Sequence, residues 1–330
     1  MADLAATWMG LRLRNPLIAG SSGLTGTPEG LRSLEKGGVG AVVLKSIFEE
    51  EIAAEYDDAV SQAARKGMSL ESYDYYDYEV RGERVSEYGK LIREAKKAVS
   101  IPVIASVNCI WSHEWASFAK DIEAAGADGL ELNMFFLPSD VARSAEDRDR
   151  DYLAIVERVR AQVKIPVALK IGSSFSNLAQ MIVRLSKTGV AGLVLFNRFY
   201  SIDFDIEKMA VTGAGTLSSP AEITGPLRWI ALMARRVECD LASSTGVYDG
   251  AGLIKMVLAG AKAVQAASCF YKNGAGSAAV MLEELSAWMD RHGFKAIEDF
   301  RGRLSQAESV NPGVYERVQY MKHYAGDAGR

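Results

Sequence analysis

Two short phrases alternate along this chain of 330 residues, and together they restrict its fold more than any other feature. The first is a glycine followed by an apolar run: GGVGAVVLKS from Gly37, AGADGLELN from Ala125, TGVAGLVLFN from Thr188 and AGAKAVQAAS from Ala259. Glycine suits the left-handed residue that ends many helices, and a run of Val, Leu and Ala suits a strand buried on both faces. Each copy therefore predicts the end of a helix followed by a parallel strand.

The second phrase is a strand that in three of its copies opens with proline, where a missing N–H costs little. Its copies are NPLIAGSS from Asn15, IPVIASVN from Ile101, IPVALKIG from Ile165 and the looser ECDLASST from Glu238. Interleaved, the two phrases predict eight strands that begin near residues 16, 41, 102, 128, 166, 191, 240 and 262. Amphipathic segments with helical spacing lie between them, for example at 113–126 and 151–164.

Eight strands that alternate with helices predict an α/β fold, the (β/α)8 TIM barrel, with a doubly wound sheet of fewer strands as the alternative. A further helical segment at 278–293 follows the eighth strand and would close the ring, which favours the barrel. The connections after strands two and six are long, so we expect insertions there that overhang the catalytic face. Without any linker-like tract, 1–330 is expected to be a single domain, with 294–330 as a C-terminal extension packed outside the barrel.

Composition and charge exclude several classes of function. The chain has 38 basic and 42 acidic residues and no basic run, which argues against nucleic-acid binding and favours a small-molecule partner. The N-terminus does not resemble a signal peptide, and no apolar run approaches the roughly 18 residues of a membrane span, so we expect a cytoplasmic protein without membrane contact. Three scattered cysteines and three histidines predict neither disulfides nor a metal site.

Polar side chains gather where the predicted strands end, and in a barrel these ends face one pocket. A buried, unpaired charge is costly, so lysines at these positions indicate an anionic or electron-rich ligand, although a salt bridge to a neighbouring carboxylate would also satisfy them. The set comprises Ser21, Ser22, Lys45, Ser46, Asn108, Asn133, Lys170, Asn197, Ser244, Thr245, Gly246, Ala267 and Ser268.

The loops after strands seven and eight, SSTGVYDG and AASCFYKNG, are rich in small residues and lead into helices. In barrels such loops commonly bind phosphate through backbone N–H groups, although small residues also form ordinary turns. Together with two lysines and three asparagines, they favour flavin mononucleotide (FMN) as the cofactor. Its phosphate would lie in these loops, and a lysine would stabilise negative charge on its ring.

The ordered motifs of the chain resemble those of the dihydroorotate dehydrogenase family over about residues 4–290. The matching segments are NPLIAGSSG, GVGAVVLKSI, IPVIASVN, GLELN, VALKI, LVLFN, TLSSPAEITGPLRWIALM and AGAKAVQAAS. The resemblance implies an FMN-dependent oxidoreductase that oxidises dihydroorotate, or a related small cyclic acid, by hydride transfer to flavin N5 in pyrimidine biosynthesis. It also implies a homodimer and allows a separate electron-transfer subunit, and it leaves the electron acceptor open.

Carried over position by position, the resemblance assigns substrate contacts to Lys45, Asn133 and Asn197. It assigns FMN binding to Gly20, Ser21, Lys45, Ser46, Asn108, Lys170, Ser219, Thr245, Gly246, Ala267 and Ser268. The family's Cys or Ser base falls on Phe136, which cannot accept a proton, and its second asparagine falls on Pro138. Phe135 and Phe136 either pack under their loop or form an apolar wall for a different substrate.

The catalytic base is therefore unknown. The candidates that could replace it are Asp140 and four tyrosines of the first insertion, Tyr73, Tyr75, Tyr76 and Tyr78. A tyrosine has an ordinary pKa of about 10 and needs activation, so loop packing is the simpler interpretation of these four. His113 fits a surface or capping role and Cys109 a buried thiol. Two other functions stay open: a Schiff-base aldolase that uses Lys170, and a flavin-binding barrel without turnover.

Overall fold

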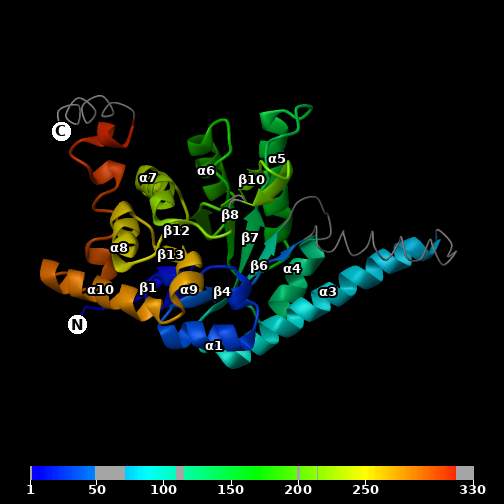
Figure 1. The fold of residues 1–330 in the computed structure, drawn as a ribbon, viewed down its shortest axis with the longest axis horizontal. Helices are drawn as coiled ribbons and strands as arrows, with labels where there is room; N and C mark the ends of the chain where they lie inside the picture. Colours follow the sequence, from blue (N-terminus) through cyan, green and yellow to red (C-terminus); the bar gives the residue numbers. More distant parts are fainter. Residues whose placement is uncertain (1, 49–70, 109–114, 199–200, 214, 317–330) are drawn as a thin grey trace.

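A computed structural model describes residues 2–48, 71–108, 115–198, 201–213 and 215–316. Its centre is a closed ring of parallel strands in the order β4-β3-β13-β12-β9-β8-β7-β6, with β6 pairing back onto β4 (Figure 1). These strands are β3 (Leu17–Ala19), β4 (Ala41–Val43), β6 (Val103–Asn108), β7 (Gly129–Met134), β8 (Val167–Ile171), β9 (Gly192–Leu195), β12 (Asp240–Ser244) and β13 (Ala263–Ala266). The predicted TIM barrel and its eight strands are confirmed. A short strand, β5 (Ile47–Phe48), extends the edge of β6.

The helices surround the barrel in the predicted alternation (Figure 1). Helix α10 contacts both α1 and α8, so it closes the outer ring as expected. The four glycines of the repeat have φ between 77° and 122°, at Gly38, Gly126, Gly189 and Gly260. The helices are α1 (Pro28–Gly37), α3 (Glu71–Ala98), α4 (Trp115–Ala124), α5 (Ala145–Arg160), α6 (Leu178–Ser186), α7 (Thr224–Met233), α8 (Gly250–Ala259), α9 (Ser268–Asn273) and α10 (Ser277–His292), with 3-10 turns η1 (Gly23–Thr25) and η2 (Pro220–Ile223).

The insertion after the second barrel strand contributes a long helix beside the barrel, and its residues 49–70, expected over the catalytic face, lie outside the described residues. Its described part is the long helix α3, whose C-terminal half packs on the barrel through buried residues such as Ile92 and Ala95. The first turns, which contain residues 73–78, extend beyond the outline of the barrel in Figure 1. The side chains of 71–83 lie outside the described residues, so the four candidate tyrosines stay a prediction.

The insertion after the sixth barrel strand forms a hairpin of β10 (Ile202–Asp205) and β11 (Ala210–Gly213) that the sequence did not reveal. Alternation places Ile202 and Phe204 on one face, and the register sets Val211 opposite Phe204. All three side chains are exposed. The hairpin therefore presents an apolar face to solvent, and the chain after it returns to the rim of the barrel.

A second unpredicted hairpin, β1 (Ala6–Trp8) and β2 (Leu11–Leu13), closes the N-terminal end of the barrel. Trp8 is 0% exposed and belongs to an apolar cluster with Met9 and Leu13. The rest of this cluster comes from inward-facing strand residues: Ile18, Ala41, Val43, Ile104, Ala168, Val194, Ala242 and Ala263. The floor of the barrel is thus made of buried, mostly apolar side chains.

Substituting Gly192 with alanine is expected to destabilise the protein by about 1–3 kcal/mol, the usual cost of overpacking a core. A Cβ at this position would lie 2.9 Å from Trp8 Cζ2 and closer still to Cη2. Chemical denaturation would measure the change. Gly225→Ala in α7 is the matched control, because nothing lies within 4 Å of its added Cβ and alanine favours helices. Equal stabilities of the two variants would contradict this interpretation of the barrel floor.

The described part of the C-terminal extension contains η3 (Ile297–Asp299), η4 (Gln306–Glu308) and η5 (Pro312–Tyr315). Phe300 is fully buried and packs edge-on against Trp288 of α10, with ring centroids 5.0 Å apart. Gly302 N and Leu304 N donate to carbonyls of α8 at 2.9 and 2.8 Å. These contacts place residues 294–316 on the outer surface of α8 and α10.

Candidate active site

The C-terminal rim of the barrel holds a pocket built by the ends of five strands. Eight residues predicted to bind cofactor or substrate line it: Gly20, Ser21, Lys170, Asn197, Thr245, Gly246, Ala267 and Ser268. Sequence reasoning singled out Ser244 as a strand-end residue but did not foresee Arg198, Thr216, Ser218, Val247, Gln265 and Ala266 in the lining. The strand-end positions therefore converge as the barrel fold requires.

Lys170 is 9% exposed and points into the barrel from β8. Its Nζ donates to Gln265 Oε1 at 2.9 Å, and Gln265 Nε2 in turn donates to Glu131 Oε2. Within the described chain Lys170 forms no direct ion pair. The expected salt bridge to a neighbouring carboxylate is met only indirectly, through the Gln265 amide that lies between Lys170 and Glu131. An ammonium has three donors, which leaves two for a ligand in the pocket. Both polar partners were visible in the sequence as polar residues between apolar neighbours, in GLELN and AVQAAS.

A chain of hydroxyls supports the opposite wall. Ser21 Oγ lies 2.9 Å from Ser46 Oγ, which lies 2.7 Å from Ser106 Oγ. Tyr88 of α3 donates its hydroxyl to the carbonyl of Ser106 and accepts from the Ser106 N–H. Burial raises the pKa of Tyr88, so this phenol stays protonated. Ser46 thus lies behind Ser21 and orients it.

The three predicted asparagines occupy neighbouring inward positions. Asn197 Nδ2 donates to Asn133 Oδ1 at 2.5 Å, which links β7 and the end of β9 across β8. Asn108 is the register partner of Asn133 and is 5% exposed. Its Oδ1 has no hydrogen-bond partner among the residues that the structure describes. A buried acceptor left unsatisfied is costly, so this atom fits a ligand that brings an N–H donor.

The loops after β12 and β13 form a cup beside the lysine. Thr245 has φ 82° and Gly246 φ 81°; a positive φ is rare for a β-branched residue and is found mainly at functional sites. Ser268 Oγ accepts from both the N–H and the hydroxyl of Ser218 at 3.0 Å. Successive backbone N–H groups in such loops bind anions.

Arg198 follows Asn197 directly and fastens the end of the second insertion to the pocket. Its Nε donates to Glu222 Oε2 at 2.6 Å, and its Nη1 donates to the carbonyls of Gly215 and Thr216. Burial raises the pKa of Glu222, but hydrogen bonds from Arg198 and Ser219 outweigh burial and lower it overall. The ion pair therefore persists at neutral pH.

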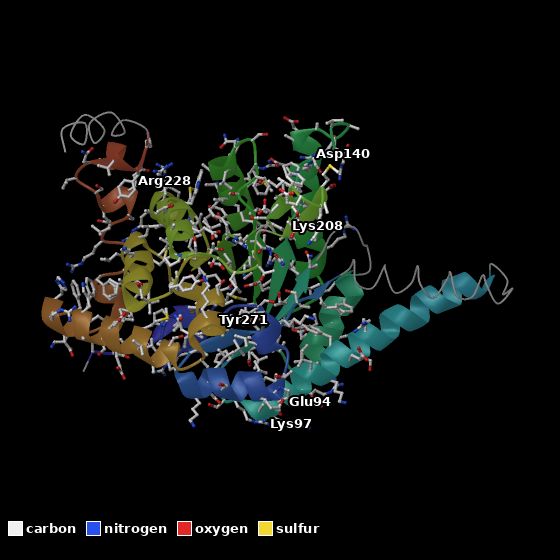
Figure 2. All side chains as sticks on the ribbon, in the orientation of Figure 1. Glu94, Lys97, Asp140, Lys208, Arg228 and Tyr271 are labelled. Carbon is white, nitrogen blue, oxygen red and sulfur yellow. The ribbon has the colours of Figure 1, made fainter. Side chains whose placement is uncertain are left out.

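Not every predicted residue lines the pocket. Lys45 follows β4 at the same rim but is exposed, beside Gly26. Ser219 caps η2 and donates its N–H to Glu222. Asp140 is exposed and stands at the edge of the molecule (Figure 2), where Ala142 N donates to its carboxylate. Cys109 and His113 lie outside the described residues.

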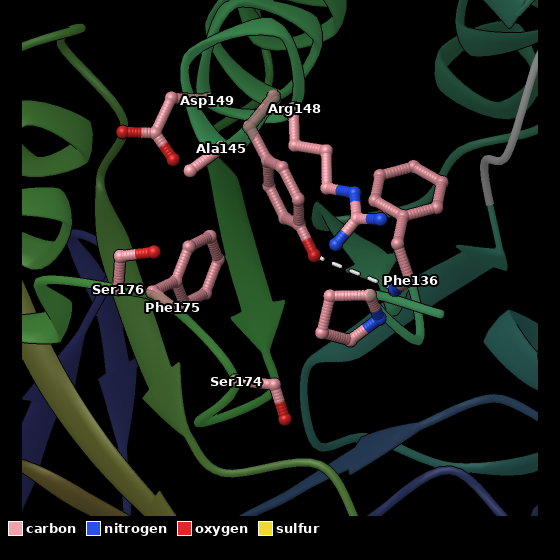
Figure 3. A pocket seen from close by; sticks show the side chains of 9 residues that line it. Phe136, Ala145, Arg148, Asp149, Ser174, Phe175 and Ser176 are labelled. Carbon is pink, nitrogen blue, oxygen red and sulfur yellow. Dashed lines mark hydrogen bonds between the residues drawn. The ribbon is translucent and has the colours of Figure 1, made fainter. Parts of the chain in front are cut away.

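Phe136, at the family's base position, lines a different hollow of about 230 Å³, together with Pro138 and Phe175 (Figure 3). Its ring meets Tyr152 of α5 edge-on at 4.9 Å, and its N–H donates to the Tyr152 hydroxyl at 3.4 Å. Burial raises the pKa of Tyr152, so the phenol stays neutral. These contacts support the packing interpretation of Phe136, because its side chain is oriented toward α5.

In the parts of the chain that are described, no three metal-binding side chains come together, and no helix has the length and apolar character of a membrane span.

The closed barrel and its rim pocket define a TIM-barrel enzyme with its ligand site at the C-terminal face. The chain belongs to the dihydroorotate dehydrogenase family, whose family model matches residues 3–289. It is therefore an oxidoreductase of the type that acts on CH–CH bonds. A relative from Thermoplasma volcanium, named dihydroorotate dehydrogenase B (NAD(+)), catalytic subunit, is 26% identical over 311 residues, covering 92% of this chain and 98% of its own. A protein of the same name from Methanothermobacter thermautotrophicus is 25% identical over 306 residues, covering 88% and 95%.

Proposed function

We propose that this protein is an FMN-dependent oxidoreductase that oxidises dihydroorotate, or a related small cyclic acid, in pyrimidine biosynthesis. One observation carries the proposal: Lys170, Asn197 and the loop Thr245–Gly246 line a single pocket at the barrel rim. The buried, unpartnered Oδ1 of Asn108 and the free donors of Lys170 fit a polar ring system. The positive φ angles at 245 and 246 fit a phosphate cup.

Bound FMN would supply a ring that accepts a hydride. Lys170, itself buried in the barrel interior, would donate hydrogen bonds to the part of the ring where negative charge develops. Backbone N–H groups at Thr245, Gly246 and Ser268 would hold the phosphate. Ser21, oriented by Ser46, would fix the position of the ring.

Asn133, Asn197 and Lys45 would hold the substrate. The mutual hydrogen bond of the two amides leaves Asn133 Nδ2 as a donor, and Lys45 offers a cation for a carboxylate. The described residues that line the pocket include no carboxylate, imidazole or thiol, and Phe136 is turned toward α5. Asp140 is exposed away from the pocket, so the tyrosines of the first insertion are the candidates for the proton acceptor.

A second chain is part of the proposal. The Thermoplasma and Methanothermobacter relatives are named as catalytic subunits, which supports a separate electron-transfer subunit here. The exposed apolar face of the β10–β11 hairpin supports contact with another chain, either that subunit or the second copy of a homodimer.

Absorption spectroscopy of the purified protein tests the cofactor and the reaction together. We expect flavin absorption bands that bleach when dihydroorotate is added without oxygen. Bands that persist would point to a different substrate or to a barrel without turnover. A colourless protein that refuses added FMN, and that borohydride links to a carbonyl substrate through Lys170, would replace the proposal with an aldolase.

A further inference from the structure

A buried carboxylate that the proposed reaction does not use lies on the inner side of Lys170. Glu131 belongs to β7 and is 1% exposed, as is Gln265 of β13. Gln265 accepts a hydrogen bond from Lys170 Nζ at 2.9 Å and donates one to Glu131 Oε2. We call these three side chains the Lys170–Gln265–Glu131 relay.

The relay crosses the lumen of the barrel. In the ring of strands, β13 and β7 are separated by three strands on either side, so Gln265 reaches across from the opposite wall. In the pairing of β7 with β8, Glu131 lies beside Ala168 and Asn133 lies beside Lys170. Glu131 is therefore one interior layer below the rim, between the apolar floor and the pocket.

The chemistry of the three groups fixes the direction of the relay. An ammonium only donates, so the carbonyl oxygen of Gln265 has to face Lys170 and its NH2 group has to face Glu131. Glu131 consequently acts as an acceptor. Its other oxygen, Oε1, is buried and has no hydrogen-bond partner in the described part of the chain. Through these hydrogen bonds the relay joins Glu131 to the cation of Lys170.

We propose that Glu131 is the countercharge of Lys170, acting through Gln265, and so sets the redox potential of the bound cofactor. The inference rests on the proposed FMN function. An uncompensated buried charge is costly, so a carboxylate below Lys170 stabilises its ammonium in the barrel interior. The same negative charge opposes the negative charge that the cofactor gains on reduction. Glu131 is thus a positioning residue, and its effect is electrostatic.

The first test is the midpoint potential of FMN bound to Glu131→Gln, measured at pH 7. Removing the negative charge should favour reduction by about tenfold, which corresponds to roughly 30 mV in the positive direction for a two-electron couple. Glu157→Gln is the matched control, because it removes an exposed carboxylate of α5 whose field solvent screens. An unchanged or lower potential in Glu131→Gln, or an equal shift in the control, would overturn the proposal.

The second test needs no flavin and separates this inference from the proposed function. In the apoprotein, Glu131→Gln and Lys170→Met should each destabilise the fold and shift the unfolding equilibrium away from the native state. In the double variant, the change in the equilibrium constant of unfolding should be about tenfold smaller than the product of the two single changes, because the double variant leaves no charge unpaired. If the two single changes in the equilibrium constant simply multiply in the double variant, Glu131 is not the countercharge of Lys170. A protein that binds no FMN would refute the proposed function and leave this cycle intact.

Should either single variant fail to fold, the double variant Glu131→Met with Lys170→Met decides the matter. It replaces both charges with side chains of similar volume, and buried ion pairs are often replaced in this way without loss of stability. A folded double variant beside unfolded single variants supports the countercharge. A double variant that also fails to fold contradicts it.

Discussion

Replacing Lys170 with methionine is expected to slow reduction of bound FMN by about 10²–10³-fold, the usual effect of removing one preorganised donor from a developing negative charge. The apoprotein should also lose roughly 3 kcal/mol of stability. The substitution leaves the Gln265 carbonyl without its hydrogen-bond donor and the Glu131 carboxylate without a compensating charge. Stopped-flow absorbance without oxygen measures the first effect, and urea denaturation of the apoprotein measures the second.

Lys45→Met is the control for stability, because that side chain is exposed and surface substitutions usually change the free energy of unfolding by no more than about 0.5 kcal/mol. Its effect on the substrate half of the site should appear as a raised KM. A Lys170→Met protein with wild-type stability and wild-type reduction would show that the lysine neither compensates Glu131 nor contacts the cofactor.

Replacing Gly246 with alanine is expected to weaken FMN binding by more than about tenfold and to destabilise the protein by about 3 kcal/mol. Two causes add: a φ of 81° is unfavourable for alanine, and the new Cβ would overlap the backbone nitrogen of Ile223 in η2. The loop has to move away from η2, which alters the phosphate cup. Fluorescence titration of the apoprotein with FMN reports affinity, and thermal unfolding reports stability.

Gly293→Ala separates the two causes. Gly293 ends α10 with φ 72°, and nothing lies within 4 Å of a Cβ added there. This control carries the backbone strain alone, so it should cost about 1 kcal/mol and leave FMN affinity unchanged. If Gly246→Ala costs no more than this control, the contact with η2 does not shape the cup.

The eight strands and most of the pocket could be predicted because parallel strands are local signals. A glycine with positive φ followed by a buried run occurs in the sequence at the place where it occurs in the structure, as at Gly38 and Gly260. Barrel closure then dictates that the strand ends meet, which brings Lys170 to Thr245 without any further knowledge.

What the sequence did not reveal depends on contacts across the barrel or within the insertions. Glu131 and Gln265 are far apart in the chain, and only the closed ring shows that a single amide bridges them. Arg198 was overlooked because its partner Glu222 lies beyond an unexpected hairpin. The orientation of Phe136 toward α5 follows from packing against Tyr152, which strand periodicity does not encode.

The N-terminal hairpin has a consequence for how the site exchanges its contents. Trp8 and its neighbours cover the N-terminal end of the barrel with buried apolar side chains. The pocket that Lys170 lines lies toward the opposite, C-terminal end of the barrel. A segment or subunit that covers this rim would therefore affect ligand entry and product release together.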